Sequence, residues 1–256
     1  MKSLFAFTKK EFLEQIRSGK VLILGTLFVL LGVMNPAVAK LTPWLLEMFA
    51  DAFRESGIIV TSVTVTAMDS WVQYFKNMPI GLIAFVLLES AVFTKEYRSG
   101  TLVLSLTKGL ARYKVIVSKA TVLLLLWTLG YALSFGITYA YNAYFWDNSI
   151  AQNLMFSIIN WWLFGGFTIA LMTLFSVISS SNTGVLFGTG GVILMFYLIG
   201  LLPKTSKYLP TLLTNGNALI YGVSEVKAYT ASILITAGLS LLCFGVSIPV
   251  FNKKQL

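Results

Sequence analysis

The sequence contains no histidine and only one cysteine, Cys243, which lies within an apolar run. A metal site built from imidazole or thiolate groups therefore has almost no ligands, and a disulfide within the chain is impossible. A Ser–His pair is excluded as well, and the phosphate-binding pattern Gly-x4-Gly-Lys-Ser/Thr does not occur. We therefore expect no catalytic residues, no metal site and no cofactor bound by this chain.

Charged residues are also scarce: they make up 11% of the chain, whereas apolar residues make up 57%. A soluble domain is usually about 25% charged and about 45–50% apolar. An apolar run of about 17–25 residues crosses a bilayer as a helix. The composition therefore predicts an all-α integral membrane protein.

Six apolar runs are long enough to span a membrane. They lie at residues 21–39, 78–94, 115–140, 154–178, 185–202 and 229–251. Lys and Arg are concentrated in cytoplasmic segments of membrane proteins. With both termini in the cytoplasm, thirteen of the 19 Lys and Arg residues fall on that side and six fall outside. The charge pattern therefore predicts cytoplasmic N and C termini.

Residues 1–20 are predicted to form an amphipathic helix on the inner membrane surface. Phe5, Phe12 and Ile16 share one face of a helical wheel, and basic neighbours can reach anionic lipid. A signal peptide is the alternative, because residues 37–39 (Ala-Val-Ala) resemble a cleavage site. Its polar n-region would contain two glutamates, which is unusual. The interfacial helix is the favoured interpretation.

Two longer segments, residues 41–77 and 203–227, are expected outside the membrane. Residues 41–57 have the pattern of a capped amphipathic helix that begins at Thr42. Residues 62–66 alternate in polarity as a half-buried strand does. The two segments form either a small extracellular cap or two loops on the lipid headgroups, and the sequence leaves both alternatives open.

The most charged segment, residues 95–114, is the one large loop expected in the cytoplasm. Its centre, residues 101–108, is about two helical turns long. Ser99 or Thr101 can cap its start, and Gly109 can end it in a left-handed conformation. So short a helix is unstable alone in water, and we therefore expect its apolar face to dock on another surface. The alternative is a loop whose basic residues only set the topology.

The motif in this loop resembles that of the ABC-2 type transporter permeases. The matching residues are Lys95, Glu96, Ser99, Gly100, Thr101, Leu102, Lys108, Gly109, Leu110, Arg112, Lys114 and Lys119. With the six spans, the resemblance covers essentially the whole chain and implies a single transmembrane domain over residues 1–256. In that family the helix in the loop is the coupling helix, which is seated in a cleft of a separate ATPase subunit.

The resemblance implies a non-enzymatic permease subunit of a bacterial ABC exporter in the cytoplasmic membrane. ATP and Mg²⁺ would bind to the partner. The implied partners are two copies of the ATPase, a second identical or related permease, membrane lipids and the transported substrate, but no nucleic acid. The residues expected to dock on the ATPase are Ser99, Gly100, Thr101, Leu102, Val103, Leu106, Lys108, Gly109 and Arg112.

Four further residues are candidates for a role in transport. Glu89 lies within the second span, near its inner end, where a charge is costly unless it is paired or functional. We expect it to have a structural or gating role rather than to bind substrate. Pro36 can kink the first span and shape a gate. Gly184 and Gly188 allow close helix packing, either against a second permease or within one subunit.

The spans are rich in Phe, Leu and Ile and nearly free of Asp and Glu. A path of this kind suits an amphipathic molecule better than a sugar chain, whose hydroxyl groups each need a partner. We therefore expect a hydrophobic or amphipathic substrate, favouring a peptide over a drug, a lipid or a glycan. Two other classes stay open: an energy-independent channel or immunity protein, and a membrane-embedded enzyme.

Overall fold

The computed structural model describes residues 2–50, 64–107 and 109–254, and within these ranges the secondary structure is entirely helical. Its elements are α1 (Lys2–Arg17), α2 (Lys20–Met48), α4 (Ala67–Glu89), α5 (Ala91–Ser99), α6 (Thr101–Thr107), α7 (Arg112–Phe145), η1 (Asn148–Ile150), α8 (Leu154–Ile178), α9 (Asn182–Gly200), α10 (Pro203–Ser206), η2 (Pro210–Thr214), α11 (Gly216–Ile220), η3 (Val226–Tyr229) and α12 (Thr230–Lys253).

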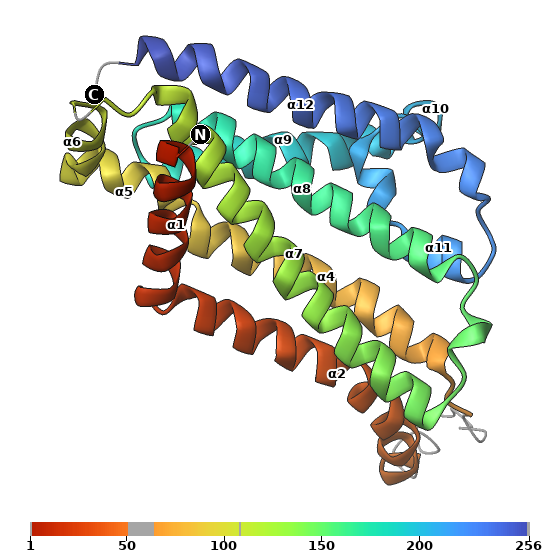
Figure 1. The fold of residues 1–256 in the computed structure, drawn as a ribbon. Coiled ribbons are helices and arrows are strands. Elements are labelled where there is room, and N and C mark those ends of the chain that lie inside the picture. Colours follow the sequence, from red (N-terminus) through yellow and green to blue (C-terminus); the bar gives the residue numbers. More distant parts are fainter. Residues whose placement is uncertain (1, 51–63, 108, 255–256) are drawn as a thin grey trace.

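Within the described residues, six helical stretches are long and apolar enough to cross a membrane, in agreement with the six predicted spans. They are Lys20–Met48, Ala67–Ser99, Arg112–Phe145, Leu154–Ile178, Asn182–Gly200 and Val226–Lys253. The long helices run side by side, and α1 lies across one end of them (Figure 1). The same end carries α6 and the last turn of α12, and we call it the N/C end. The start of α1 and the end of α12 therefore lie at the same end of the bundle.

Helix α2 is longer than predicted, because it continues through Pro36 and Pro43 to Met48. A proline at position 36 leaves the carbonyl of residue 32 without its helical donor. The Thr138 hydroxyl of α7 donates to the Gly32 carbonyl at 3.0 Å and replaces that donor. The proline is therefore accommodated within a continuous helix.

The prediction of a separate helix that begins at Thr42 is wrong. The Thr42 side chain donates back to the Val38 carbonyl at 2.8 Å, as it does within a continuing helix, instead of capping a new one. The rest of the predicted helix, from residue 51 onward, lies outside the described residues.

The second spanning helix begins at Ala67, eleven residues before the predicted start. The Asp69 carboxylate accepts a hydrogen bond from the backbone N–H of Thr66 at 2.9 Å, which fixes the first turn. Residues 64–66 are not in a strand, so this part of the predicted strand is wrong, and residues 62 and 63 lie outside the described ranges. The capping box of Thr66 and Asp69 begins a helix here, although the alternating polarity of residues 62–66 is typical of a strand.

Residues 203–229 fold into short helical turns at the other end of the bundle. Leu213, Leu219 and Ile220 are buried there, and the Trp161 indole of α8 donates to the Thr214 carbonyl at 2.9 Å. The segment is thus ordered and packed against the spanning helices. Part of the other segment of the predicted cap, residues 51–63, lies outside the described residues.

Candidate functional site

Helix α6 forms a short projection at the N/C end, with a left-handed glycine on either side of it. Gly100 has φ 68° and Gly109 has φ 88°, a conformation that other residues rarely adopt. The helix spans Thr101–Thr107, close to the predicted residues 101–108. Ser99 and Thr101 contact each other through their hydroxyl groups at 2.8 Å. The sequence therefore predicted the boundaries of this helix well.

One face of α6 is buried within the chain itself. Leu102 is only 1% exposed, and Leu106 packs beside it. The apolar cluster that receives Leu102 combines residues from α1, α5, α7, α8 and α12. Its other members are Phe7, Phe93, Val115, Ile116, Val177 and Phe251. Leu102 therefore anchors α6 to the bundle and is not available to a partner.

The opposite face of α6 is apolar but open. Leu104 is 59% exposed and Val103 is 39% exposed. Of the three apolar residues expected to share a docking face, only Val103 points outward, while Leu102 and Leu106 pack inward. The sequence pattern missed Leu104. Lys108, another predicted docking residue, lies outside the described residues.

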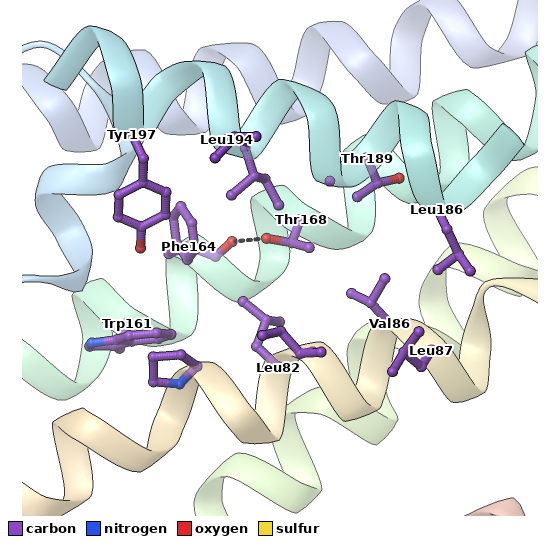
Figure 2. A pocket seen from close by; sticks show the side chains of 14 residues that line it. Leu82, Val86, Leu87, Trp161, Phe164, Thr168, Leu186, Thr189, Leu194 and Tyr197 are labelled. Carbon is purple, nitrogen blue, oxygen red and sulfur yellow. Dashed lines mark hydrogen bonds between the residues drawn. The ribbon is translucent and has the colours of Figure 1, made fainter. Parts of the chain in front are cut away.

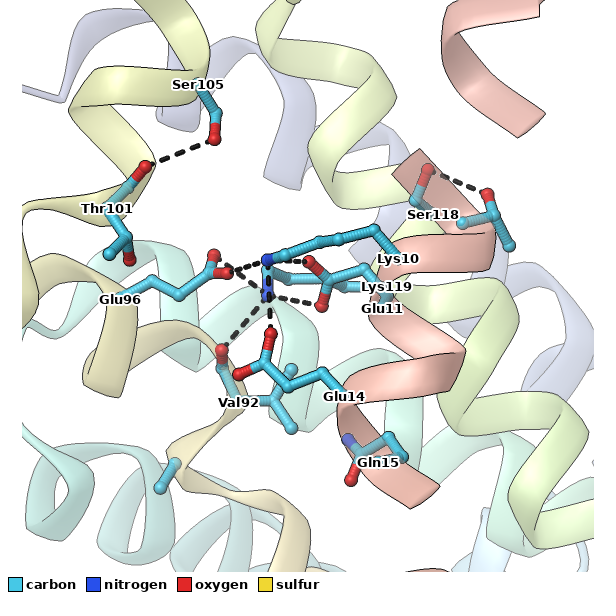
Figure 3. Close-up of polar contacts among 12 residues, drawn as sticks. Lys10, Glu11, Glu14, Gln15, Val92, Glu96, Thr101, Ser105, Ser118 and Lys119 are labelled. Atoms are coloured by element: carbon cyan, nitrogen blue, oxygen red, sulfur yellow. Dashed lines mark hydrogen bonds and ion pairs between the residues drawn. The ribbon is translucent and has the colours of Figure 1, made fainter. Parts of the chain in front are cut away.

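A buried ion-pair network lies next to α6, between α1, α5 and α7 (Figure 3). The ammonium group of Lys119 lies 2.7 Å from Glu11 and 2.9 Å from Glu96. Lys10 lies 2.7 Å from Glu96 and also pairs with Glu11 and Glu14. Because the buried charges have little access to water, each depends on its partners. The network ties α1 to α7 and to α5, the helix that leads into α6.

Burial acts to lower the pKa of Lys10. The hydrogen bond to Glu96 and the negative charge of Glu11 outweigh this effect and hold the pKa above its ordinary value. Lys10 therefore keeps its positive charge at physiological pH.

Carboxylate oxygens of Glu11, Glu14 and Glu96 lie within 4.8 Å of one another, which is close enough to bind a cation. The ammonium groups of Lys10 and Lys119 already lie among these carboxylates. Two fixed positive charges at the same place oppose a metal ion. The chemistry of this cluster is that of an internal ion-pair network.

Glu89 belongs to a second polar cluster at the N/C end. Its carboxylate accepts a hydrogen bond from the Gln15 amide at 2.7 Å and pairs with Lys20 at 3.2 Å. Glu89 is the last residue of α4, so these contacts join α4 to the junction between α1 and α2. The charge of Glu89 within the span is thus paired with a basic residue, Lys20.

The face of α1 that packs on the bundle was not predicted from the sequence. Of the predicted apolar face, Phe5 and Ile16 are exposed within this subunit and Phe12 is partly buried. The buried residues of α1 are Phe7, Glu11 and Gln15, which follow one another at intervals of four residues. This four-residue spacing was the signal in the sequence for a face that packs against the bundle. The two polar residues on it are buried because Glu11 pairs with Lys119 and Gln15 bonds to Glu89, and both partners are distant in the chain.

The two candidate glycines of α9 pack within the chain. A Cβ atom at Gly188 would lie 2.3 Å from the Phe175 ring of α8, and one at Gly184 would lie 2.2 Å from the Ser179 hydroxyl. Both positions need glycine for contacts inside one subunit. Of the two interpretations, packing against a second permease or packing within one subunit, these contacts favour the second.

A groove of about 400 Å³ lies between α4, α8 and α9 (Figure 2). Its walls are mostly aliphatic and aromatic. The labelled residues that line it are Leu82, Val86, Leu87, Trp161, Phe164, Thr168, Leu186, Thr189, Leu194 and Tyr197. The Thr168 hydroxyl donates to the Phe164 carbonyl at 3.0 Å, whereas the buried Thr189 hydroxyl has no hydrogen-bond partner among the described residues. The groove suits an apolar ligand with few polar groups.

The described part of the chain thus forms a bundle with six helices long and apolar enough to span a membrane, and the short helix α6 lies between the second and third of them. The sequence matches the family described as ABC-2 family transporter protein over residues 5–256. The chain belongs to this ABC-2 transporter family. A comparison with curated proteins gave no match. The protein is thus a multi-pass membrane permease of an ABC transporter, and the family implies that a separate ABC ATPase works with it.

Proposed function

We propose that this ABC-2 permease is an exporter that receives mechanical force from its ATPase through the exposed face of α6. The observation that carries the proposal is that one face of α6 is buried and the other is exposed. Leu102 is fixed in the bundle, while Val103 and Leu104 face outward. A short helix transmits force only if one face is rigidly held and the other is free to contact a partner. The ATP and Mg²⁺ sites belong to the ATPase in this proposal.

The assembly follows from the same proposal. Two ATPase subunits serve a pair of permeases, which are either two copies of this chain or this chain and a related one. The N/C end lies in the cytoplasm, where ATP is available, and the charge bias of the sequence supports this orientation. Helices α1 and α6 and the end of α12 lie at this end of the bundle (Figure 1), so all three would face the ATPase in this proposal.

The orientation predicts distinct labelling of two exposed sites. Single cysteines are introduced as Thr107→Cys, at the end of α6, and Asp147→Cys, beyond α7, in a Cys243→Ser background. A membrane-impermeant thiol reagent added outside cells should label position 147, whereas position 107 should react only after the membrane is opened. Labelling of position 107 in intact cells would place α6 on the wrong side for an ATPase.

The groove supports a hydrophobic or amphipathic substrate. Its mostly apolar walls would leave the hydroxyl groups of a glycan without partners, which is costly away from water. We propose a peptide with an apolar face as the substrate class. Small drugs and lipids of similar polarity are the alternatives that the same groove would admit.

The substrate class is tested by ATP turnover of the reconstituted complex with a panel of amphipathic peptides, apolar drugs and glycolipids. We expect peptides to raise turnover several-fold. Leu194→Trp narrows the groove and should abolish this stimulation, whereas Leu241→Trp, on an exposed position of α12, should not. Stimulation by glycolipids alone would contradict the peptide assignment and leave the role of α6 intact.

A further inference from the structure

Arg112 has a role inside the chain that differs from the predicted contact with an ATPase. One guanidinium nitrogen, Nη1, donates to the carbonyls of Phe251 at 2.7 Å, Asn252 at 3.2 Å and Lys254 at 2.7 Å. These carbonyls belong to the C-terminal end of α12, where helical carbonyls lack their usual donors. A cation at this end of a helix is also favoured by the helix dipole. Arg112, the first residue of α7, thus holds the end of α12.

Lys254 makes the matching connection from α12 to α8. Its ammonium group donates to the carbonyls of Val177 at 2.8 Å and Ser179 at 3.0 Å, at the C-terminal end of α8. The same group lies 4.3 Å from the centre of the Tyr97 ring of α5. Burial lowers the pKa of Lys254 below its ordinary value, which indicates that protein groups have replaced part of its water.

Tyr97 closes the arrangement from the side of α5. Its hydroxyl donates to the Ser176 carbonyl of α8 at 3.1 Å, and its ring packs near Phe251 of α12. Leu102 of α6 lies in the same apolar cluster as Phe251 and Val177. Helix α6 therefore contacts α8 and α12 by apolar packing through Leu102, and the helices on either side of it, α5 and α7, hold the carbonyl ends of α8 and α12 by hydrogen bonds.

We propose that Arg112 and Lys254 form a carbonyl clasp that makes α8 and α12 move together with α6. They are positioning residues: neither contacts nucleotide or substrate, and both hold helix ends in place. Hydrogen bonds from a charged donor are about twice as strong as neutral ones, so the clasp resists separation when α6 is displaced. The inference rests on the proposed function, because the displacement of α6 comes from the ATPase.

The clasp holds the last carbonyls of α8 and α12. Helix α8 also forms one wall of the groove, through Trp161, Phe164 and Thr168. A shift of α8 with α6 therefore changes the width of the groove directly. The clasp is accordingly the connection through which ATP hydrolysis would act on the substrate path.

The experiment measures a nucleotide-dependent distance at the far end of the bundle. Spin labels are placed by Lys76→Cys on α4 and Met155→Cys on α8, two exposed positions on helices that line the groove, in a Cys243→Ser background. The permease is purified with its ATPase. The distance between the two labels is measured by double electron–electron resonance, first without nucleotide and then after trapping with ATP and vanadate. With an intact clasp we expect the distance distribution to shift.

The double variant Arg112→Gln/Lys254→Gln should lose this shift and still retain the ATPase, because the Val103–Leu104 face is unchanged. Lys253→Gln removes one positive charge at the neighbouring exposed position and should behave as wild type. Lys254→Arg keeps a donor for the α8 carbonyls and should restore most of the shift relative to Lys254→Gln. A merely stabilising role would alter thermal stability but leave the shift unchanged.

The outcomes separate the clasp from the proposed function. If the double variant retains the full shift, the clasp inference is wrong and the docking proposal stands. If the wild-type permease binds no ATPase, the proposed function fails. Should the double variant not fold, the single variant Lys254→Gln decides: a full shift in that variant also overturns the clasp.

Discussion

Leu104→Asp is expected to weaken the complex between this permease and its ATPase by about 30-fold, the effect of losing a contact worth about 2 kcal/mol at an interface centre. Leu104 is the most exposed apolar residue of α6. A carboxylate at this position must lose its water when the partner binds, and nothing in an apolar socket compensates for that loss. The measurement is the dissociation constant of the ATPase for the purified permease in nanodiscs.

Leu102→Ala is the matched control on the opposite face of the same helix. It removes apolar packing from the buried cluster and should lower the stability of the permease by about 2–5 kcal/mol. The folded protein should still bind the ATPase, because its outer face is intact. Normal binding by Leu104→Asp together with lost binding by folded Leu102→Ala would reverse the assignment of the two faces.

Lys119→Met is expected to lower the free energy of unfolding by about 3 kcal/mol, near the lower end of the cost of breaking a buried ion pair. The substitution leaves Glu11 and Glu96 buried without the ammonium group that they share. Lys10 still pairs with both carboxylates, which limits the loss. The effect is measured by thermal unfolding of the purified permease.

Lys114→Met is the control for this prediction, because Lys114 lies on the same helix but is only partly buried, and its hydrogen bond to the Ser3 hydroxyl is exposed. Its effect should stay within about 0.5 kcal/mol. Adding Glu96→Gln to Lys119→Met removes one of the uncompensated charges and should recover part of the stability. Equal stability of the Lys119 and Lys114 variants would show that the buried network contributes nothing.

The spans and the boundaries of α6 could be predicted because both depend on local sequence. Long apolar runs are sufficient to form spanning helices. The left-handed backbone of Gly100 separates α6 from the helix before it, and that of Gly109 follows its end. The end of α2 could not be predicted in the same way. A proline usually indicates a break, but the hydroxyl of Thr138, far along the chain, supplies the missing donor to Gly32.

The orientation of α6 is the clearest case of information that local sequence does not contain. Leu102, Val103, Leu104 and Leu106 are similar in polarity, so the pattern does not say which of them face the bundle. Burial of Leu102 depends on Phe7 and Phe251, which come from opposite ends of the chain. The role of Arg112 likewise depends on carbonyls at the end of α12.

The most direct test of the central claim is a photocrosslinking amino acid incorporated in place of Leu104 in cells. The cross-linked product is isolated and identified by mass spectrometry, and the same group in place of Leu241 on α12 serves as the control. We predict that position 104 captures a protein that carries the pattern Gly-x4-Gly-Lys-Ser/Thr and that position 241 does not. Capture of no such ATPase at position 104, in cells where the ATPase is shown to be bound to the permease, would contradict the claim that α6 is its docking site.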